Sequence, residues 1–460
     1  MAPRKQKTSL VRQVQYPVNK NKSVTVGKFF ETGWKDYVIY TISNRAIPSV
    51  IDGLKPSQRK AVFCARQQRK MIKVSGLTGA TMTDGNYHHG DASMNDTIIG
   101  LAAPYSNNIP LLDKEGVFGS RLVKDAGAPR YISVKISNNF DKYFFDNHIL
   151  TPQPDPEDPE PLFYLPIIPW VLVNGVEGIA TAYSTDIPRF NPKDIAALCY
   201  GYINGKSIDS YEILPYYEGF QGTFQKSGKG FLCSGRVNVI DSNTFEITEI
   251  PLHFDHLKYV AVLDNLKQKD IIASYTDDSR DGVFKFVVKL RKTNGPSIGR
   301  GSTMSDKDII KNFKLESKIP MNLNVLDEKN NLMTFNSPID IIKYFCDYRI
   351  KTIQTRITTN IKLVNDKIDL YNERLKFIQL VLDSKITFKN NTRVQLIEQM
   401  VKHKLNQDYF DSHLEVKIYN LTTDSIQKTK DAIADLTTQL NYWNTTTPVK
   451  EFSKDLKSVI

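Results

Sequence analysis

The sequence predicts a multidomain α+β protein with a basic, helix-rich region, a mixed α/β region and a long helical arm. Three observations support this prediction. The chain has 460 residues, 40% of them hydrophobic and 24% charged, which suffices for roughly two to four domains with cores of their own. Short β-branched and aromatic runs separated by turn residues fill the middle of the chain. Apolar residues at heptad spacing run through its last third.

The excess of basic residues lies in the first third of the chain. In total, 61 Lys and Arg stand against 50 Asp and Glu, a formal net charge of +11. Residues 1–150 hold 22 basic and 11 acidic residues, whereas residues 151–460 hold 39 of each. A local basic excess is typical of surfaces that bind polyanions, so nucleic acid is the first partner to expect.

The sequence argues against several protein classes. No stretch approaches the roughly 18 apolar residues of a membrane span, and no apolar core follows the basic start, so we expect neither a membrane protein nor a secreted one. The four cysteines are widely separated among apolar or aromatic neighbours, which favours buried thiols over metal ligands or disulfides. They are Cys64, Cys199, Cys233 and Cys346.

Residues 1–27 are predicted to be a disordered basic arm. Residues 1–24 hold six Lys or Arg and no acidic residue, with little apolar periodicity. Two interpretations stay open. The arm is either a solubilising tail or a segment that contacts phosphates or a partner protein.

Residues 28–150 are predicted to be a winged-helix type of DNA-binding domain. A helix is expected over residues 58–70, and a turn at residues 116–119 precedes a strand near residues 131–136. Small helices and a short strand pair on a basic surface are typical of this domain type. An earlier helix ends before Pro48, and its apolar stripe consists of Val38, Ile39, Ile42 and Ala46.

Residues 151–338 are predicted to be a mixed α/β domain. Its first segment, PQPDPEDPEP at residues 152–161, holds five prolines and four acidic residues. We therefore expect an extended surface connector there, with a domain boundary near residue 150. Alternating apolar runs beyond it predict strands over residues 236–240, 244–250 and 283–290.

Residues 339–460 are predicted to be a long antiparallel coiled-coil arm with a small helical globule. Two apolar stripes have the length to pair, and the segment between them is polar and Asn-rich. A plain two-helix packing element is the alternative. The first stripe is Ile357, Ile361, Val364, Ile368, Tyr371, Leu375, Ile378 and Leu382, and the second is Ile426, Ile433, Leu436, Leu440 and Trp443.

The chain carries no evident motif for a nucleotide or a metal ion. The GKG at residues 228–230 lacks the spacing of a phosphate-binding loop. The acidic residues within 155–158 and 277–281 are separated by prolines or fall in a turn. If the chemistry needs Mg²⁺ or ATP, we expect another chain to provide the binding groups.

Several ordered motifs carry a family resemblance. They are NRAIPSVIDGLKPSQRK at residues 44–60, NYHHGD at 86–91, FGSR at 118–121, APRYI at 128–132 and YLPIIPWVLVNGVEGIATAYSTDIPRFNP at 164–192. Together they resemble the breakage-reunion part of the type IIA DNA topoisomerases, which includes the middle of eukaryotic topoisomerase II and the gyrase A subunit. The resemblance covers nearly all of the chain after about residue 28.

Within this family, the YHHG motif and the end of the chain after the arm most resemble the medium subunits of T4-like bacteriophage topoisomerases. That resemblance implies a winged-helix DNA-gate domain, a tower domain and an arm that forms an exit gate, in a homodimer. It also implies double-stranded DNA as substrate and a large ATPase/Toprim partner subunit, in a heterotetramer or larger complex. The partner would bind ATP and most of the Mg²⁺, and the location would be the cytoplasm, that of the host cell for a viral protein.

The family's chemistry implies a transient double-strand break through 5′-phosphotyrosyl links, so that a second duplex passes and DNA is relaxed or decatenated. Tyr131 would be the nucleophile, and it directly follows Arg130. The guanidinium forks of Arg130 and Arg45 suit the oxygens of a phosphate on which charge builds. His89 is the expected proton acceptor or hydrogen-bond donor beside the tyrosine.

Six further residues are expected to contact DNA. Basic residues of the first motif are assigned to phosphates of the gate duplex. An isoleucine of the last motif matches the family's apolar wedge, which slips between base pairs. The first histidine of YHHG shapes its loop. The full set is Lys55, Arg59, Lys60, His88, Arg121 and Ile179.

Two other functions stay open. A catalytically silent DNA-binding and bridging protein would use the basic domain and a coiled-coil dimerisation arm to organise DNA without cutting it. A tyrosine recombinase or nicking enzyme agrees less well with the sequence. Its nucleophile is expected near the C-terminus, whereas Tyr131 comes early in the chain.

Overall fold

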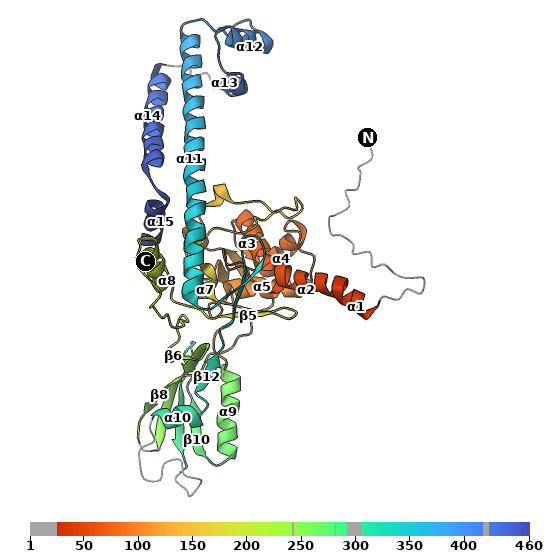
Figure 1. Ribbon diagram of the computed structural model, residues 1–460, viewed down its shortest axis with the longest axis vertical. Helices are drawn as coiled ribbons and strands as arrows, with labels where there is room; N and C mark the ends of the chain where they lie inside the picture. Colours follow the sequence, from red (N-terminus) through yellow and green to blue (C-terminus); the bar gives the residue numbers. More distant parts are fainter. Residues whose placement is uncertain (1–24, 242, 281, 292–305, 417–422) are drawn as a thin grey trace. The chain divides into compact units, whose positions relative to one another are not determined.

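The computed structural model describes residues 25–241, 243–280, 282–291, 306–416 and 423–460 (Figure 1). The predicted basic arm lies outside these residues, apart from its last three. The chain divides into two compact units, residues up to 345 together with 459–460, and residues 346–458. Helices and antiparallel sheets both occur, so the predicted α+β class is confirmed.

The first unit begins with a helical segment that contains two π-helical turns. Its parts are α1 (Val26–Phe29), a π-turn (Phe30–Trp34), α2 (Lys35–Thr41) and a second π-turn (Ile42–Ala46). Of the predicted apolar stripe, Ile42 and Ala46 are buried and Val38 is partly buried, but Ile39 is 51% exposed. Ile39 lies about 100° around the helix from Val38, off the buried face.

Three helices and a three-stranded antiparallel sheet follow. They are α3 (Pro56–Gln68), β1 (Ile72–Lys73), α4 (Val74–Thr83), α5 (Asp91–Ala102), β2 (Leu112–Glu115) and β3 (Ser133–Ile136), with strand order β1–β3–β2. Helix α3 matches the helix predicted over residues 58–70. It begins at Pro56, which suits a first helical turn, and the Gln58 side chain caps the Lys55 N–H at 2.9 Å.

The proline-rich segment 152–161 is a closed loop, so the extended connector expected from the sequence is wrong. Pro152 and Pro161 form an isolated β-bridge, and the Leu162 N–H donates to the Thr151 carbonyl at 2.8 Å. Proline prevents regular structure inside the segment, but it does not prevent the two ends from meeting.

The next part of the unit contains a short hairpin. It consists of β4 (Val176–Ile179) and β5 (Ser184–Ile187), and its neighbours along the chain are α6 (Asn138–Tyr143), a 3₁₀ turn (Asn147–Ile149), α7 (Trp170–Asn174) and α8 (Pro192–Ile203). Strand β5 also pairs with the residue that precedes a second hairpin. That hairpin consists of β13 (Leu323–Leu326) and β14 (Leu332–Phe335). There, Asp186 and Asn322 exchange both backbone hydrogen bonds, at 2.9 and 2.8 Å.

Two further antiparallel sheets have the strand orders β12–β7–β6 and β10–β11–β9–β8. Their strands are β6 (Thr223–Ser227), β7 (Gly230–Ser234), β8 (Arg236–Val239), β9 (Thr244–Glu249), β10 (Ile272–Asp277), β11 (Phe286–Leu290) and β12 (Glu316–Ile319). Helices α9 (His256–Gln268) and α10 (Asp306–Asn312) contact β10 and β8. The strands predicted from the alternating runs correspond to β8, β9 and β11.

The second unit is helical. Helix α11 runs for 45 residues from Pro338 to Leu382, and it is followed by α12 (Arg393–Lys402), a 3₁₀ turn (Gln407–Tyr409), α13 (Phe410–Leu414), α14 (Thr423–Thr445) and α15 (Pro448–Lys457). Arg356 of α11 forms an ion pair with Asp455 of α15 at 2.9 Å. Both side chains are nearly buried, so this pair ties the two helices together.

Side-chain burial along α11 and α14 follows the predicted stripes. Ile357, Val364, Ile378 and Leu436 are buried, and the other stripe residues are partly buried except Leu382, which is 41% exposed. In the described part of the chain, no helix is long and apolar enough to span a membrane. A small core beside α12 and α13 consists of Phe377, Ile386, Leu396, Met400, Leu405 and Phe410.

Candidate active site

The start of helix α4 fixes the backbone around Tyr131. Tyr131 lies in a turn just before β3, and its N–H donates to the Ala128 carbonyl at 2.8 Å. The first two N–H groups of α4 donate to the carbonyls of Pro129 and Ile132, at 3.2 and 3.0 Å. The Lys73 ammonium donates to the Tyr131 carbonyl at 3.0 Å. Helix-start N–H groups lack partners within their own helix, so these bonds hold the turn in place.

The Tyr131 side chain is accessible. It is 68% exposed, and its hydroxyl has no hydrogen bond to any described residue. The Arg130 guanidinium lies 4.9 Å from the centroid of its ring. The turn therefore presents a phenol and a permanent cation together on a fixed backbone, and such a pair can attack and bind a phosphate.

His89 lies on the loop before α5 and contacts Tyr40. The Tyr40 hydroxyl is 2.9 Å from Nε2 of His89. The neighbouring His88 is exposed. Within the described ranges, no hydrogen bond joins His89 to Tyr131. The predicted role of His89 beside Tyr131 therefore stays a prediction.

Arg45 is exposed in the second π-turn, beside hairpin β4–β5. Gly178 of β4 brings the two segments together, because a Cβ at Gly178 would lie only 2.1 Å from the carbonyl oxygen of Ala46. Single π-helical turns are frequent at functional sites. The hairpin and Arg45 thus belong to one local arrangement.

Hairpin β4–β5 presents Ile179 to solvent with 90% of the side chain exposed. The hairpin's other edge is held by two asparagines. Asn322 and Asn324 each donate from Nδ2 to the Ser184 carbonyl at 2.7 Å, and Asn324 is itself buried. An apolar tip on a base that is held at both edges is suited to insertion between DNA bases.

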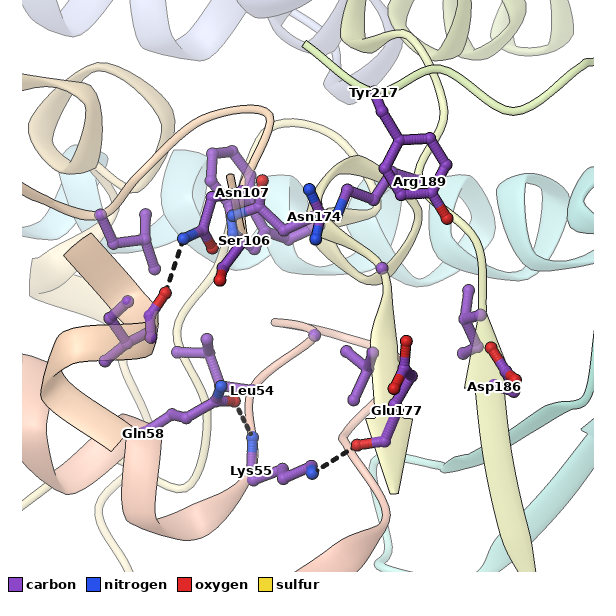
Figure 2. A pocket seen from close by; sticks show the side chains of 18 residues that line it. Leu54, Lys55, Gln58, Ser106, Asn107, Asn174, Glu177, Asp186, Arg189 and Tyr217 are labelled. Atoms are coloured by element: carbon purple, nitrogen blue, oxygen red, sulfur yellow. Dashed lines mark hydrogen bonds between the residues drawn. The ribbon is translucent and has the colours of Figure 1, made fainter. Parts of the chain in front are cut away.

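A cavity of about 310 Å³ opens between the start of α3 and this hairpin (Figure 2). Lys55 lines it and donates from Nζ to the Glu177 carbonyl at 2.6 Å. Burial lowers the pKa of Lys55. Burial and the facing Glu177 raise the pKa of Asp186 to about 6. Lys55 therefore ties α3 to the hairpin in this structure.

Arg59 and Lys60 point into the protein. Arg59 binds the Asp52 carboxylate with two hydrogen bonds, at 2.8 and 3.1 Å. The Lys60 ammonium lies 2.7 Å from Asp158 and 3.0 Å from Glu160. The sequence-based interpretation assigned both residues to DNA phosphates. The structure pairs them with internal carboxylates instead, because these positions of α3 face the core.

Arg121 is also engaged inside the protein. It pairs with Glu249 at 2.8 Å, and its guanidinium lies over the rings of Phe220 and Phe284, 5.1 Å from each centroid. Its expected contact with DNA is replaced by these internal contacts. Arg121 anchors the loop that leads to Tyr131.

Sequence reasoning missed Tyr40, Asn322 and Asn324. Their contacts lie 49, 138 and 140 residues away along the chain, and no local pattern marks them. Among the described residues, no three His, Cys, Asp or Glu side chains gather closely enough to hold a metal ion.

Comparison with known proteins gives one consistent result. The DNA topoisomerase medium subunit of Enterobacteria phage T4 is 33% identical over 429 residues, which is 92% of this chain and 96% of that protein. DNA topoisomerase 2 of Candida albicans is 34% identical over 81% of this chain, which spans only 26% of the fungal protein.

The fold agrees with this result. A crystal structure of the Plasmodium falciparum topoisomerase II DNA-binding, cleavage and re-ligation domain matches with a TM-score of 0.84 and 28% identity. The match covers 95% of this chain and 64% of that one. The family model for the A subunit of DNA gyrase/topoisomerase IV matches residues 45–458. The chain therefore belongs to the family of DNA gyrase/topoisomerase IV A subunits and is homologous to the cleavage and re-ligation domain of type II topoisomerases.

Proposed function

We propose that this chain is the DNA-cleaving and religating subunit of an ATP-dependent type II topoisomerase. The observation that carries the proposal is the exposed Tyr131 beside Arg130 on a backbone that α4 holds in place. Family membership supports it. A transient double-strand break would let a second duplex pass, so that DNA is relaxed or decatenated.

In the proposed reaction, the Tyr131 hydroxyl oxygen attacks a phosphorus of the DNA backbone. The new O–P bond forms while the bond to the 3′ oxygen breaks, the phenol loses its proton, and the 3′ oxygen takes one up. The product is a 5′-phosphotyrosyl ester, from which the 3′ hydroxyl can reverse the reaction. Arg130 and Arg45 stabilise the charge that builds on the phosphate oxygens, and His89 hydrogen-bonds there.

The DNA would lie along the exposed basic and apolar groups near this tyrosine. Arg45 and His88 are exposed and available to phosphates. Ile179 would enter between base pairs and kink the duplex. Lys55, Arg59, Lys60 and Arg121 would act indirectly, because their contacts hold the hairpin, the loops and α3 in position.

We propose a homodimer that acts, in the cytoplasm, with a large partner subunit that binds ATP and Mg²⁺. A double-strand break needs one tyrosine for each strand, which two copies would supply. The name of the phage T4 relative, a medium subunit, supports an assembly with other subunits. An exposed aromatic surface on the segment from α1 to α2 supports partner docking. It consists of Phe29, Phe30, Trp34 and Tyr37.

The test combines the full chain, an ATPase/Toprim partner subunit, Mg²⁺ and supercoiled plasmid. After a detergent quench, we expect wild-type protein covalently attached to the 5′ ends of cleaved DNA. Tyr131→Phe should abolish attachment and keep the DNA Kd within about two-fold, because it removes one oxygen and no charge. Tyr211→Phe is the matched control, since Tyr211 is 59% exposed, and it should keep attachment.

Two results would contradict the proposal. If the wild-type chain binds DNA but forms no covalent product, the DNA-binding and bridging function becomes the better explanation. If Tyr131→Phe loses binding and attachment to the same extent, Tyr131 is a binding residue and not the nucleophile.

A further inference from the structure

We propose that Tyr40 is a positioning residue that sets the ring orientation and tautomer of His89. The inference rests on the proposed function, in which His89 acts at the cleaved phosphate. Tyr40 comes from α2 and His89 from the loop before α5, 49 residues further along. Their side chains meet with 2.9 Å between the Tyr40 hydroxyl and Nε2 of His89, a normal hydrogen-bond length.

Two aromatic rings restrict the imidazole of His89. The ring of Tyr87 meets it edge-on, with centroids 5.3 Å apart and an interplanar angle of 69°. The ring of Tyr40 lies 6.4 Å away at 52°. Tyr87 is itself buried, and its N–H donates to the Thr81 carbonyl at 3.2 Å. Packing against Tyr87 limits where the ring lies, and the Tyr40 hydroxyl determines how it is turned.

The chemistry of the two groups gives the hydrogen bond a direction. A phenol is a better donor than acceptor, and an unprotonated imidazole nitrogen is a good acceptor. Tyr40 therefore donates to Nε2, and in the neutral ring the proton must then lie on Nδ1. Nδ1 has no hydrogen bond to any described residue. His89 thus offers an N–H donor at Nδ1, the group that binds a phosphate oxygen.

The position of Tyr40 in the chain adds to this role. Arg45, the second proposed phosphate-binding residue of this region, lies five residues further on in the adjoining π-turn. A single helical segment therefore carries Arg45 and the residue that orients His89. A residue that orients a reacting group through a hydrogen bond helps to hold that group in its productive geometry.

The kinetic test measures the rate of covalent-complex formation in the full assembly. Tyr40→Phe should slow cleavage roughly five-fold, the effect of one ordinary hydrogen bond, and leave the DNA Kd unchanged. Tyr211→Phe is the matched control, because Tyr211 is 59% exposed and belongs neither to the proposed site nor to the proposed docking surface. It should cleave at the wild-type rate.

A double variant separates positioning from a general structural effect. If Tyr40 acts through His89, Tyr40→Phe should cause no further loss when it is added to His89→Ala. An equal loss in both backgrounds would overturn the proposal, and so would a wild-type rate for Tyr40→Phe.

A second measurement does not depend on cleavage. In the isolated chain with ¹⁵N-labelled histidine, His89 can be assigned among the seven histidines by the variant His89→Gln. We expect the Nδ1–H tautomer in the wild type and a shift toward Nε2–H in Tyr40→Phe. An unchanged tautomer would overturn the proposal about Tyr40 even if Tyr131 cleaves DNA, whereas a missing covalent product with the expected tautomer would count against the proposed function alone.

Discussion

At the residue scale, exposure distinguishes Tyr131 from the buried tyrosines of the chain. Burial raises the pKa of Tyr217 to about 12, and it raises the pKa of Tyr164 and Tyr259 as well. Such phenols are poor nucleophiles, because their ionised form is disfavoured and DNA cannot reach them. Tyr131, by contrast, is within reach of DNA, since 68% of it is exposed on a turn that α4 holds.

At the same scale, cationic side chains that form ion pairs inside the protein differ from cationic side chains that are exposed. Asp158 accepts hydrogen bonds from Lys60 at 2.7 Å and from Asn86 at 3.0 Å. Asn86 begins the loop that carries His88 and His89. Lys60 is therefore a support of the proline-rich loop and, through Asp158, of the histidine loop.

Lys60→Met should lower the unfolding free energy by about 3 kcal/mol, because it leaves the buried carboxylate of Glu160 without its cation. Thermal melting of the isolated chain measures this change. The control is Lys70→Met at an exposed position, which should melt like the wild type. If Lys60→Met keeps its stability and instead flattens the salt dependence of DNA binding, Lys60 is a phosphate contact after all.

At the scale of elements, the hairpin β4–β5 links several parts of the site. One edge lies against the π-turn of Arg45, the other is bound by Asn322 and Asn324, and Lys55 ties it to α3. An isoleucine that is 90% exposed can act as a wedge only if its base does not move when DNA pushes back.

Gly178→Ala should weaken DNA bending, because the added methyl group collides with the Ala46 carbonyl and must push the hairpin away from Arg45. Energy transfer between dyes at the two ends of a short duplex measures the bend. Gly79→Ala is the matched control, since nothing lies within 4 Å of its added methyl group. A wild-type bend in Gly178→Ala would show that the hairpin's close approach is not needed.

At the scale of the whole molecule, the chain consists of two compact units that α11 connects. The first contains Tyr131, His89, Arg45 and Ile179, and thus the whole candidate site. The second has a core of its own in its helical globule. We therefore expect the covalent attachment of Tyr131 to one DNA strand to be separable from stable dimer formation.

Replacing residues 383–422 by a flexible Gly/Ser linker should leave covalent cleavage intact but weaken the dimer and plasmid relaxation. The change removes the globule and keeps α11, α14 and the ion pair of Arg356 with Asp455. Sedimentation and relaxation assays measure the two losses. Inserting the same linker after Ser384 without a deletion is the control. Unchanged relaxation after the replacement would contradict an exit-gate role for the globule.

Most of the secondary structure that the sequence predicts correctly follows from local residue patterns. The strands near residues 236–290, helix α3 and the stripes of α11 and α14 were predictable because each depends on spacing within one segment. Segment 152–161 was not, because proline content reports the local backbone, and neither the bridge that closes the loop nor the ion pairs of the loop with Lys60 on α3 can be read from it.

The sequence by itself determined the α+β class, the family and the identity of the tyrosine beside an arginine, because these are contiguous or periodic features. Only the tertiary structure decided which charges are free and which partners orient them. Arg59 and Lys60 form ion pairs with internal carboxylates, whereas Arg45 is exposed. Tyr40 contacts His89, which lies 49 residues further along the chain. The physical reason is that burial and side-chain pairing depend on how elements pack, and packing brings together residues that are distant in the chain.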